Sequence, residues 1–147
     1  MNRNVYKYGV GANSYHAAGE IDGIACLVGK FFHNMDAFPE ARIIREMHPH
    51  DLTESRKKLI YFLCEWLGGP KLYAEHYGVI NIPGVHSHLA IGDAERDAWL
   101  YCMRKAIDVQ QYQESFKEYL FEQLKVPAER IKQRCSFKST DKLSTSR

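Results

Sequence analysis

A helical period of apolar residues runs through most of the chain and limits the folds open to it. In its first segment, Ile24, Val28, Phe31 and Met35 follow one another at intervals of three or four residues. That spacing places them on one face of an α-helix, whereas a half-buried strand needs strict alternation. No segment alternates in that way, so the predicted fold class is all-α. The helices are expected over residues 21–35, 39–47, 52–66, 93–106 and 112–124.

Capping and turn residues mark where several of these helices begin and end. Asp51, with Glu54 three residues later, is typical of a capping box that opens the helix over residues 52–66. Gly68-Gly69-Pro70 then stops that helix. Asp93 is the expected N-cap of the following helix.

The remaining segments carry breakers or polar sequence. Gly78 and Pro83 predict an irregular stretch over residues 70–91, and Pro127 is expected to interrupt the last helix. A short basic amphipathic piece would then run to Cys135. The final residues, KSTDKLSTSR, are polar enough to form a loose tail.

Charge, hydropathy and cysteines exclude several classes of function. A net charge of +2 gives no electrostatic footprint for nucleic acid or an anionic membrane. The N-terminus has no apolar run of signal-peptide type, and the longest apolar stretch, residues 59–67, is too short to span a bilayer. We therefore expect a cytoplasmic protein. The four cysteines form no C-x-x-C pair, and three fall in apolar helical stretches, as reduced and buried thiols do.

Two motifs in combination make the chain resemble a known family. HPHDLTESRKKLIYFLCEWLGGPKLYAEHYG contains an L-G-G-P-x-x-Y run from Leu67 to Tyr73, and ERDAWLYCMRKA begins at Glu95. A histidine, His86, lies between them. From about Asp22 to about Asp108 the sequence resembles a group II truncated haemoglobin, a bacterial globin.

The resemblance implies a two-over-two helical sandwich around one haem. Residues 24–35 and 52–67 would lie on the distal side of the haem, His86 on the proximal side, and the helix carrying Trp99 along the pocket. Residues 1–18 would be an N-terminal extension, 19–135 the truncated globin domain and 136–147 a polar C-terminal tail. The extension would either pack as a short extra helix or stay loose.

The resemblance assigns the iron to His86. A five-coordinate haem needs one neutral imidazole on its proximal side, and the chain has seven histidines. His86 matches the family's ligand position, and His88 is the rival two residues away. Because the chain has no C-x-x-C-H motif, the cofactor would be haem b held non-covalently.

Other residues would hold the cofactor around its edge. Val85 stands where the family commonly has a basic residue that helps bind a haem propionate. Lys58 matches another basic position and could take that role, or it could be a solvated charge; Tyr73 could add a hydroxyl. Further side chains expected at the cofactor are Phe32, Ser55, Leu59, Phe62, Leu63 and Trp99.

The expected distal side has few hydrogen-bond donors. Phe32 stands where the family usually has a tyrosine, so a hydroxyl is lost there. Trp99 can donate through its indole N–H to a bound ligand, or it can be an ordinary core tryptophan. His48 falls at the corner before the long distal helix. It is a second candidate for stabilising the ligand and a candidate sixth iron ligand, but His48-Pro49-His50 could also be a plain exposed loop.

Four functions remain open from the sequence. The first is a haem protein that reversibly binds O2, together with NO and CO, in oxygen binding or transport. The second is a haem enzyme that detoxifies NO by dioxygenation, or peroxide or peroxynitrite, with an external reductant and a separate reductase. The third is a helical interaction domain without haem. The fourth is a zinc site of His48, His50 and nearby cysteines, whose spacing matches no closed ligand set.

Overall fold

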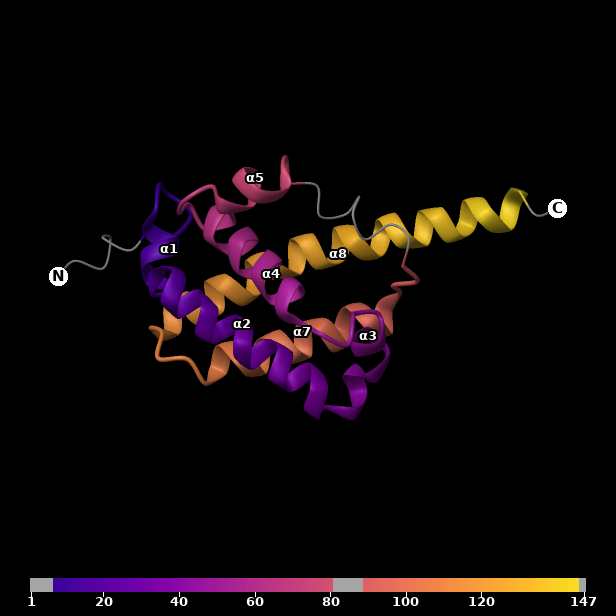
Figure 1. The fold of residues 1–147 in the computed structure, drawn as a ribbon, viewed down its shortest axis with the longest axis horizontal. Helices are drawn as coiled ribbons and strands as arrows, with labels where there is room; N and C mark the ends of the chain where they lie inside the picture. The colour runs from indigo at the N-terminus through magenta and orange to yellow at the C-terminus, as the bar shows by residue number, and fades with distance from the viewer. Residues whose placement is uncertain (1–6, 81–88, 146–147) are drawn as a thin grey trace.

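Two pairs of long helices form the body of the molecule (Figure 1). The computed structural model describes residues 7–80 and 89–145, with side chains to residue 135. Helix α2 (Glu20–Ala37) packs on α4 (Thr53–Trp66), and α7 (Asp93–Asp108) packs on α8 (Glu114–Thr145). Because α2 also packs on α7, the two pairs form the expected all-α, two-over-two sandwich.

Short elements connect the long helices. Helix α1 (Asn13–Ala17) packs on α2, and α5 (Leu72–Tyr77) packs on α4. The helix expected over residues 39–47 is divided into a 3₁₀ turn, η2 (Pro39–Ala41), and α3 (Arg42–Glu46). Helix α5 corrects the sequence analysis, which expected no regular element between residues 70 and 80.

The apolar faces of the long helices meet in one core. Asn34 is a buried polar residue there, and its Nδ2 donates to the carbonyl oxygen of Cys102 at 3.0 Å, which ties α2 to α7. Cys64 and Cys102 are buried as expected, but Cys26 lies on the outer face of α2 and is exposed. Ile21 is also exposed although it fits the helical period. The largest fully buried side chains are Phe31, Phe32, Phe116, Ile24, Leu27, Met35, Leu63, Met103, Ile107, Leu120, Leu124 and Val28.

The turn after α4 follows directly from its two glycines. The N–H of Gly68 bonds the carbonyl of Glu65 at 3.0 Å, and the N–H of Gly69 bonds that of Cys64 at 2.8 Å. This is a Schellman motif, whose C′ residue adopts a left-handed conformation, and Gly68 has φ +94°. A Cβ on Gly68 would also overlap the carbonyl oxygen of Gly11.

The N-terminal extension is packed against the domain over its described part. The hydroxyl of Tyr8 lies 2.7 Å from Oγ of Ser115, and its ring lies 5.3 Å from that of Phe116. The N–H of Tyr15 donates to the carbonyl of Leu67 at 3.0 Å. Of the two alternatives for this segment, a short extra helix is the one formed.

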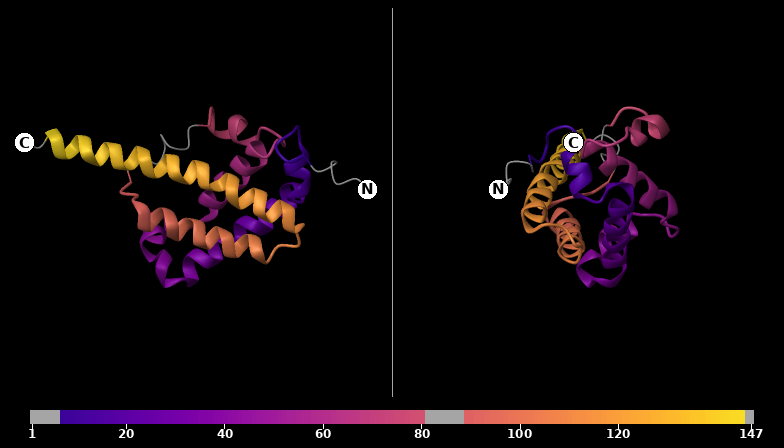
Figure 2. Two further views of the ribbon diagram at one scale, coloured as in Figure 1. Left: turned by 180° about the vertical axis from the view of Figure 1, so that it is seen from behind. Right: turned by 90° about the vertical axis from the view of Figure 1, so that its left-hand side faces the viewer.

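Helix α8 continues through Pro127, so the expected interruption is wrong. Leu124 and Ala128 are buried around the proline, and this packing holds the segment helical although Pro127 cannot donate a backbone hydrogen bond. The helix extends beyond the body at its C-terminal end (Figure 2). Over residues 7–80 and 89–145, no helix has the length and apolarity needed to cross a bilayer.

The helix starts differ slightly from the expected caps. Oδ1 of Asp51 accepts bonds from the N–H of Thr53 at 2.9 Å and its hydroxyl at 2.7 Å. Glu54 does not complete a capping box, because its carboxylate accepts the hydroxyl of Tyr77 instead. At α7 the cap lies one residue earlier than expected, where Gly92 N–H donates to Glu95 Oε1 at 2.8 Å.

Candidate functional site

A cavity of about 400 Å³ lies between the two helix pairs. Helices α2, α3 and α4 supply one side, and α7 and α8 supply the other. Its size lies within the range of roughly 300–1,000 Å³ that is usual for cofactor and ligand sites. The lining residues are Phe31, Phe32, Ile44, Met47, His48, Ser55, Lys58, Leu59, Phe62, Tyr73, Leu89, Ile91, Glu95, Arg96, Trp99, Leu124, Pro127, Ala128 and Ile131.

Most residues expected at the cofactor line this one cavity. Leu63 does not, because it points into the core and has no exposed surface. His86, its rival His88 and the departure at Val85 lie outside the described residues. The side chains brought together as expected are Phe32, His48, Ser55, Lys58, Leu59, Phe62, Tyr73 and Trp99.

An aromatic wall runs along α2 and α7. The ring of Phe31 lies 5.1 Å from the indole of Trp99 and 5.0 Å from the ring of Phe32. Phe32 is only 2% exposed and presents no polar atom to the cavity. Trp99 is half-buried at the same wall, and its indole N–H is a hydrogen-bond donor only.

His48 lies two residues after the end of α3 and contacts the ring of Phe32 on α2. Its Nδ1 lies 2.8 Å from the carbonyl oxygen of Ile44, and its ring meets Phe32 edge-on at 5.7 Å. A carbonyl only accepts, so this bond assigns the proton of the neutral imidazole to Nδ1. Nε2 then carries a lone pair and can accept a hydrogen bond or coordinate a metal.

Arg45 braces the corner that carries His48. Its Nε lies 2.6 Å from Oδ1 of Asp36, and its Nη1 and Nη2 each donate at 3.0 Å to the carbonyls of Pro49 and His50. The backbone N–H of His48 also bonds the carbonyl of Arg45 at 3.0 Å. The corner is thus a loop in which Pro49 and His50 are exposed, as one alternative expected, but Arg45 ties it to α2 and α3 and His48 is half-buried.

Three polar side chains border the cavity on the α4–α5 side. Lys58 is exposed, and its Nζ lies 5.2 Å from the ring centre of Tyr77. Tyr73 is only 7% exposed, and Ser55 is half-buried. A cation at this border, next to a phenol and a hydroxyl, suits the carboxylate end of an otherwise apolar ligand.

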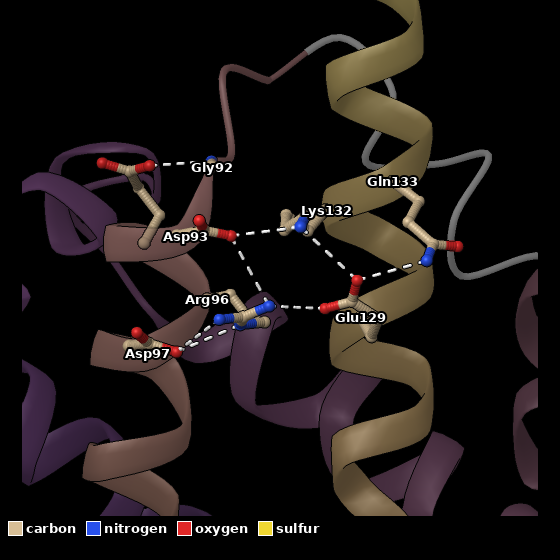
Figure 3. Close-up of polar contacts among 8 residues, drawn as sticks. Gly92, Asp93, Arg96, Asp97, Glu129, Lys132 and Gln133 are labelled. Carbon is tan, nitrogen blue, oxygen red and sulfur yellow. Dashed lines mark hydrogen bonds and ion pairs between the residues drawn. The ribbon is translucent and has the colours of Figure 1, made fainter.

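Arg96 is a second cation at the cavity, and a charge network holds it between α7 and α8 (Figure 3). Its guanidinium lies 2.5 Å from Glu129 and 3.0 Å from Asp97. Lys132 bonds Asp93 at 3.1 Å and Glu129 at 3.4 Å. The bond from Lys132 lowers the pKa of Asp93, and the bond from Arg96 lowers the pKa of Glu129.

Sequence reasoning missed the contribution of α8 to the cavity. Pro127, Ala128 and Ile131 line it because the helix does not break at the proline. The sequence did carry a signal, since Leu124, Ala128 and Ile131 continue the three- and four-residue period across Pro127. The pairing of Arg96 with Glu129 joins residues far apart in the sequence, so no local pattern predicts it.

The cavity fits a haem in shape and chemistry. A porphyrin is flat and largely apolar, with carboxylates at one edge, and the walls are aromatic and aliphatic while Lys58 and Arg96 supply cations. His48 presents an imidazole whose Nδ1 already bonds a backbone carbonyl, as one ring nitrogen of a metal-binding histidine usually does. Within the described part of the chain, no three His, Cys, Asp or Glu side chains gather as a metal site of their own, which the zinc hypothesis requires.

Comparisons with known proteins agree with this geometry. Residues 13–133 match the family described as bacterial-like globin. Group 2 truncated hemoglobin YjbI of Bacillus subtilis (strain 168) is 34% identical over 114 residues, which are 78% of this chain and 83% of that protein.

Solved structures of truncated haemoglobins superpose on the chain. The group II 2-on-2 hemoglobin of Agrobacterium tumefaciens matches with a TM-score of 0.77 at 34% identity, over 80% of this chain and 92% of that one. The truncated oxygen-avid haemoglobin of Bacillus subtilis matches with a TM-score of 0.74 at 32% identity, over 80% and 97%. The fold, the cavity and these likenesses together show that this chain belongs to the bacterial-like globin family, as a haem-binding globin of the group II truncated type.

Proposed function

We propose that this globin holds a non-covalent haem b through His86 and reversibly binds O2, with NO and CO as further ligands. The observation that carries the proposal is the apolar cavity between the helix pairs, with Trp99 and His48 as polar groups on its walls. The likeness to an oxygen-avid haemoglobin supports O2 as the ligand. When bound, a ferrous haem supplies the iron to which diatomic ligands attach.

Trp99 would provide the hydrogen bond that keeps O2 in place. A bound O2 carries partial negative charge, so a nearby donor slows its loss. Phe32 has no donor, and the N–H of His48 is used by the carbonyl of Ile44. Of these three side chains, the indole of Trp99 is the donor left for a ligand.

His48 would have a different role, as the sixth ligand of the haem iron. Its Nε2 lone pair is available at the cavity because the Nδ1 proton is already bonded. We therefore propose that His48 binds the iron in part of the population when no exogenous ligand is present. Lys58, with Tyr73, would meet the propionates.

Absorption spectra of the purified protein in its ferric, ferrous and CO-bound forms test the haem assignment. A Soret band that shifts with CO is expected in the wild type and in His88→Ala. His86→Ala should lose stable haem binding, because the proximal imidazole is gone. The reverse pattern would move the ligand to His88, and an absent Soret band in the wild type would refute the function.

A further inference from the structure

Aromatic side chains on α4 and α5 form a line from the cavity wall to the surface. Tyr73 lines the cavity, and its ring lies 5.1 Å from that of Tyr77 on the next turn of α5. Tyr77 lies 6.4 Å from Tyr61 of α4, and Tyr61 lies 4.7 Å from the exposed ring of His76. Helices α4 and α5 lie side by side, so every step of this line crosses packed side chains (Figure 1).

Tyr77 has a proton acceptor in place. Its hydroxyl donates to Oε2 of Glu54 at 2.5 Å, the short distance of a hydrogen bond to a carboxylate. The same bond is the reason that Glu54 does not complete a capping box at the start of α4. A general base within hydrogen-bond reach can take a proton as the bond to it breaks.

The two lysines near the rings of Tyr77 and Tyr61 make a proton acceptor necessary for the oxidation of Tyr77. Nζ of Lys58 lies 5.2 Å from the ring centre of Tyr77, and Nζ of Lys57 lies 5.9 Å from that of Tyr61. A nearby cation stabilises an electron-rich ring and opposes a positive charge on it. Removing an electron from Tyr77 is therefore favourable only if the phenol proton leaves with it, toward Glu54.

Tyr77 keeps its phenolic proton until an electron is removed from it. Burial, with the adjacent carboxylate of Glu54, raises the pKa of Tyr77 to about 12. At neutral pH the group is thus a hydrogen-bonded phenol rather than a phenolate. Such a phenol can release a proton and an electron together.

We propose that Tyr73, Tyr77 and Tyr61 form a relay that carries single electrons from a small phenolic reductant at the surface to the haem cavity, with hydrogen peroxide as the oxidant. The relay rests on the proposed haem binding and gives a route for the peroxide chemistry considered from the sequence. In this proposal, α5 conducts electrons to the cavity as well as forming part of its wall.

The chemistry balances over one cycle. Hydrogen peroxide takes up two electrons and two protons, its O–O bond breaks, and two waters form. Each electron passes from Tyr77 through Tyr73 to the cavity as the O–H bond of Tyr77 breaks, and the phenol proton moves to Oε2 of Glu54. A phenolic reductant near Tyr61 and His76 then gives up one electron, which passes through Tyr61 to Tyr77, and the proton on Glu54 returns to Tyr77. The reductant releases its own proton to water, and water supplies the protons that the peroxide takes up. Two reductant molecules are thus oxidised by one electron each for every peroxide.

Freeze-quench EPR of the haem-loaded ferric protein mixed with hydrogen peroxide tests the relay. The wild type should give a tyrosyl radical. Tyr77→Phe should lose most of that signal, and Glu54→Gln should weaken it because glutamine accepts the hydrogen bond but not the proton. The matched control is Tyr101→Phe, since Tyr101 also lies under a lysine, with Lys105 Nζ at 5.6 Å, but on α7 and away from the relay.

A second experiment measures the pKa of Tyr77 and does not require the protein to react with peroxide. In the CO-bound ferrous protein labelled with ¹³C-tyrosine, NMR titration should show that Glu54→Gln lowers the pKa of Tyr77 from about 12 toward its ordinary 10. Tyr77→Phe identifies the resonance.

The outcomes separate the two proposals. A wild type with no Soret band overturns the haem assignment and the relay together. A normal Soret band and CO complex with an equal radical signal in wild type and Tyr77→Phe overturns only the relay. So does a signal that Tyr101→Phe removes and Tyr77→Phe leaves unchanged. Loss in Tyr77→Phe alone, with the titration shift in Glu54→Gln, supports it.

Discussion

Changing Trp99 to phenylalanine keeps an aromatic side chain against Phe31, whose ring lies 5.1 Å away, but removes the indole N–H. A neutral hydrogen bond contributes about 1 kcal/mol net, so O2 should leave the variant roughly fivefold faster. The cavity walls are mostly apolar, and an electrostatic bond is stronger in such surroundings. A loss of ~2 kcal/mol would correspond to about thirtyfold.

The assay is stopped-flow displacement of O2 by CO from the ferrous protein. Trp66→Phe is the matched control, because Trp66 stacks on Phe62 at 5.7 Å but does not line the cavity. Its O2 dissociation rate should equal that of the wild type. An unchanged rate in Trp99→Phe would mean that Trp99 is a packing residue and that no indole bond holds the ligand.

Two further predictions concern the distal corner and the α4 turn. The absorption spectrum of the ferric wild type should show a low-spin fraction near neutral pH. This fraction should disappear in His48→Ala and persist in the control His50→Ala. A purely high-spin wild type, or a low-spin fraction that survives in His48→Ala, would contradict ligation of the iron by His48. Gly68→Ala should lower the free energy of unfolding by about 2–4 kcal/mol in urea titrations, because φ +94° and the carbonyl of Gly11 both oppose a Cβ. Gly29→Ala, in open space within α2, should be neutral or stabilising, and equal effects of the two changes would refute the argument.

The sequence predicted best those parts of the fold that local patterns determine. The apolar periods of α2, α4 and α7 and the stop at Gly68 need only neighbouring residues. Helix α5 was missed because it is short and stands between Pro70 and Gly78, where breakers dominate the local pattern. Its stability comes from packing on α4, and this tertiary contact cannot be inferred from the sequence of either segment alone.

The predictions for the site divide in the same way, because its positions could be expected from the sequence and its tertiary contacts could not. The resemblance placed Phe32, His48 and Trp99 at one cavity, because a shared fold carries shared positions. The tautomer of His48 and the bracing by Arg45 depend on contacts that form only in the folded corner. The assignment of His86 to the iron remains a prediction, since residues 81–88 are not described.

Phe32 changes what the other distal side chains can do. A tyrosine there would offer a hydroxyl to the ligand, whereas in our proposal Trp99 is the donor and His48, whose Nδ1 bonds the carbonyl of Ile44, accepts or coordinates through Nε2. In our proposal the two residues would therefore act in opposite directions, since Trp99 would slow ligand loss while coordination by His48 would oppose ligand entry. The apparent O2 affinity would then fall in proportion to the fraction of molecules in which His48 is not bound to the iron. The bonds from Arg45 hold the corner that carries His48, so we expect their loss to change that fraction.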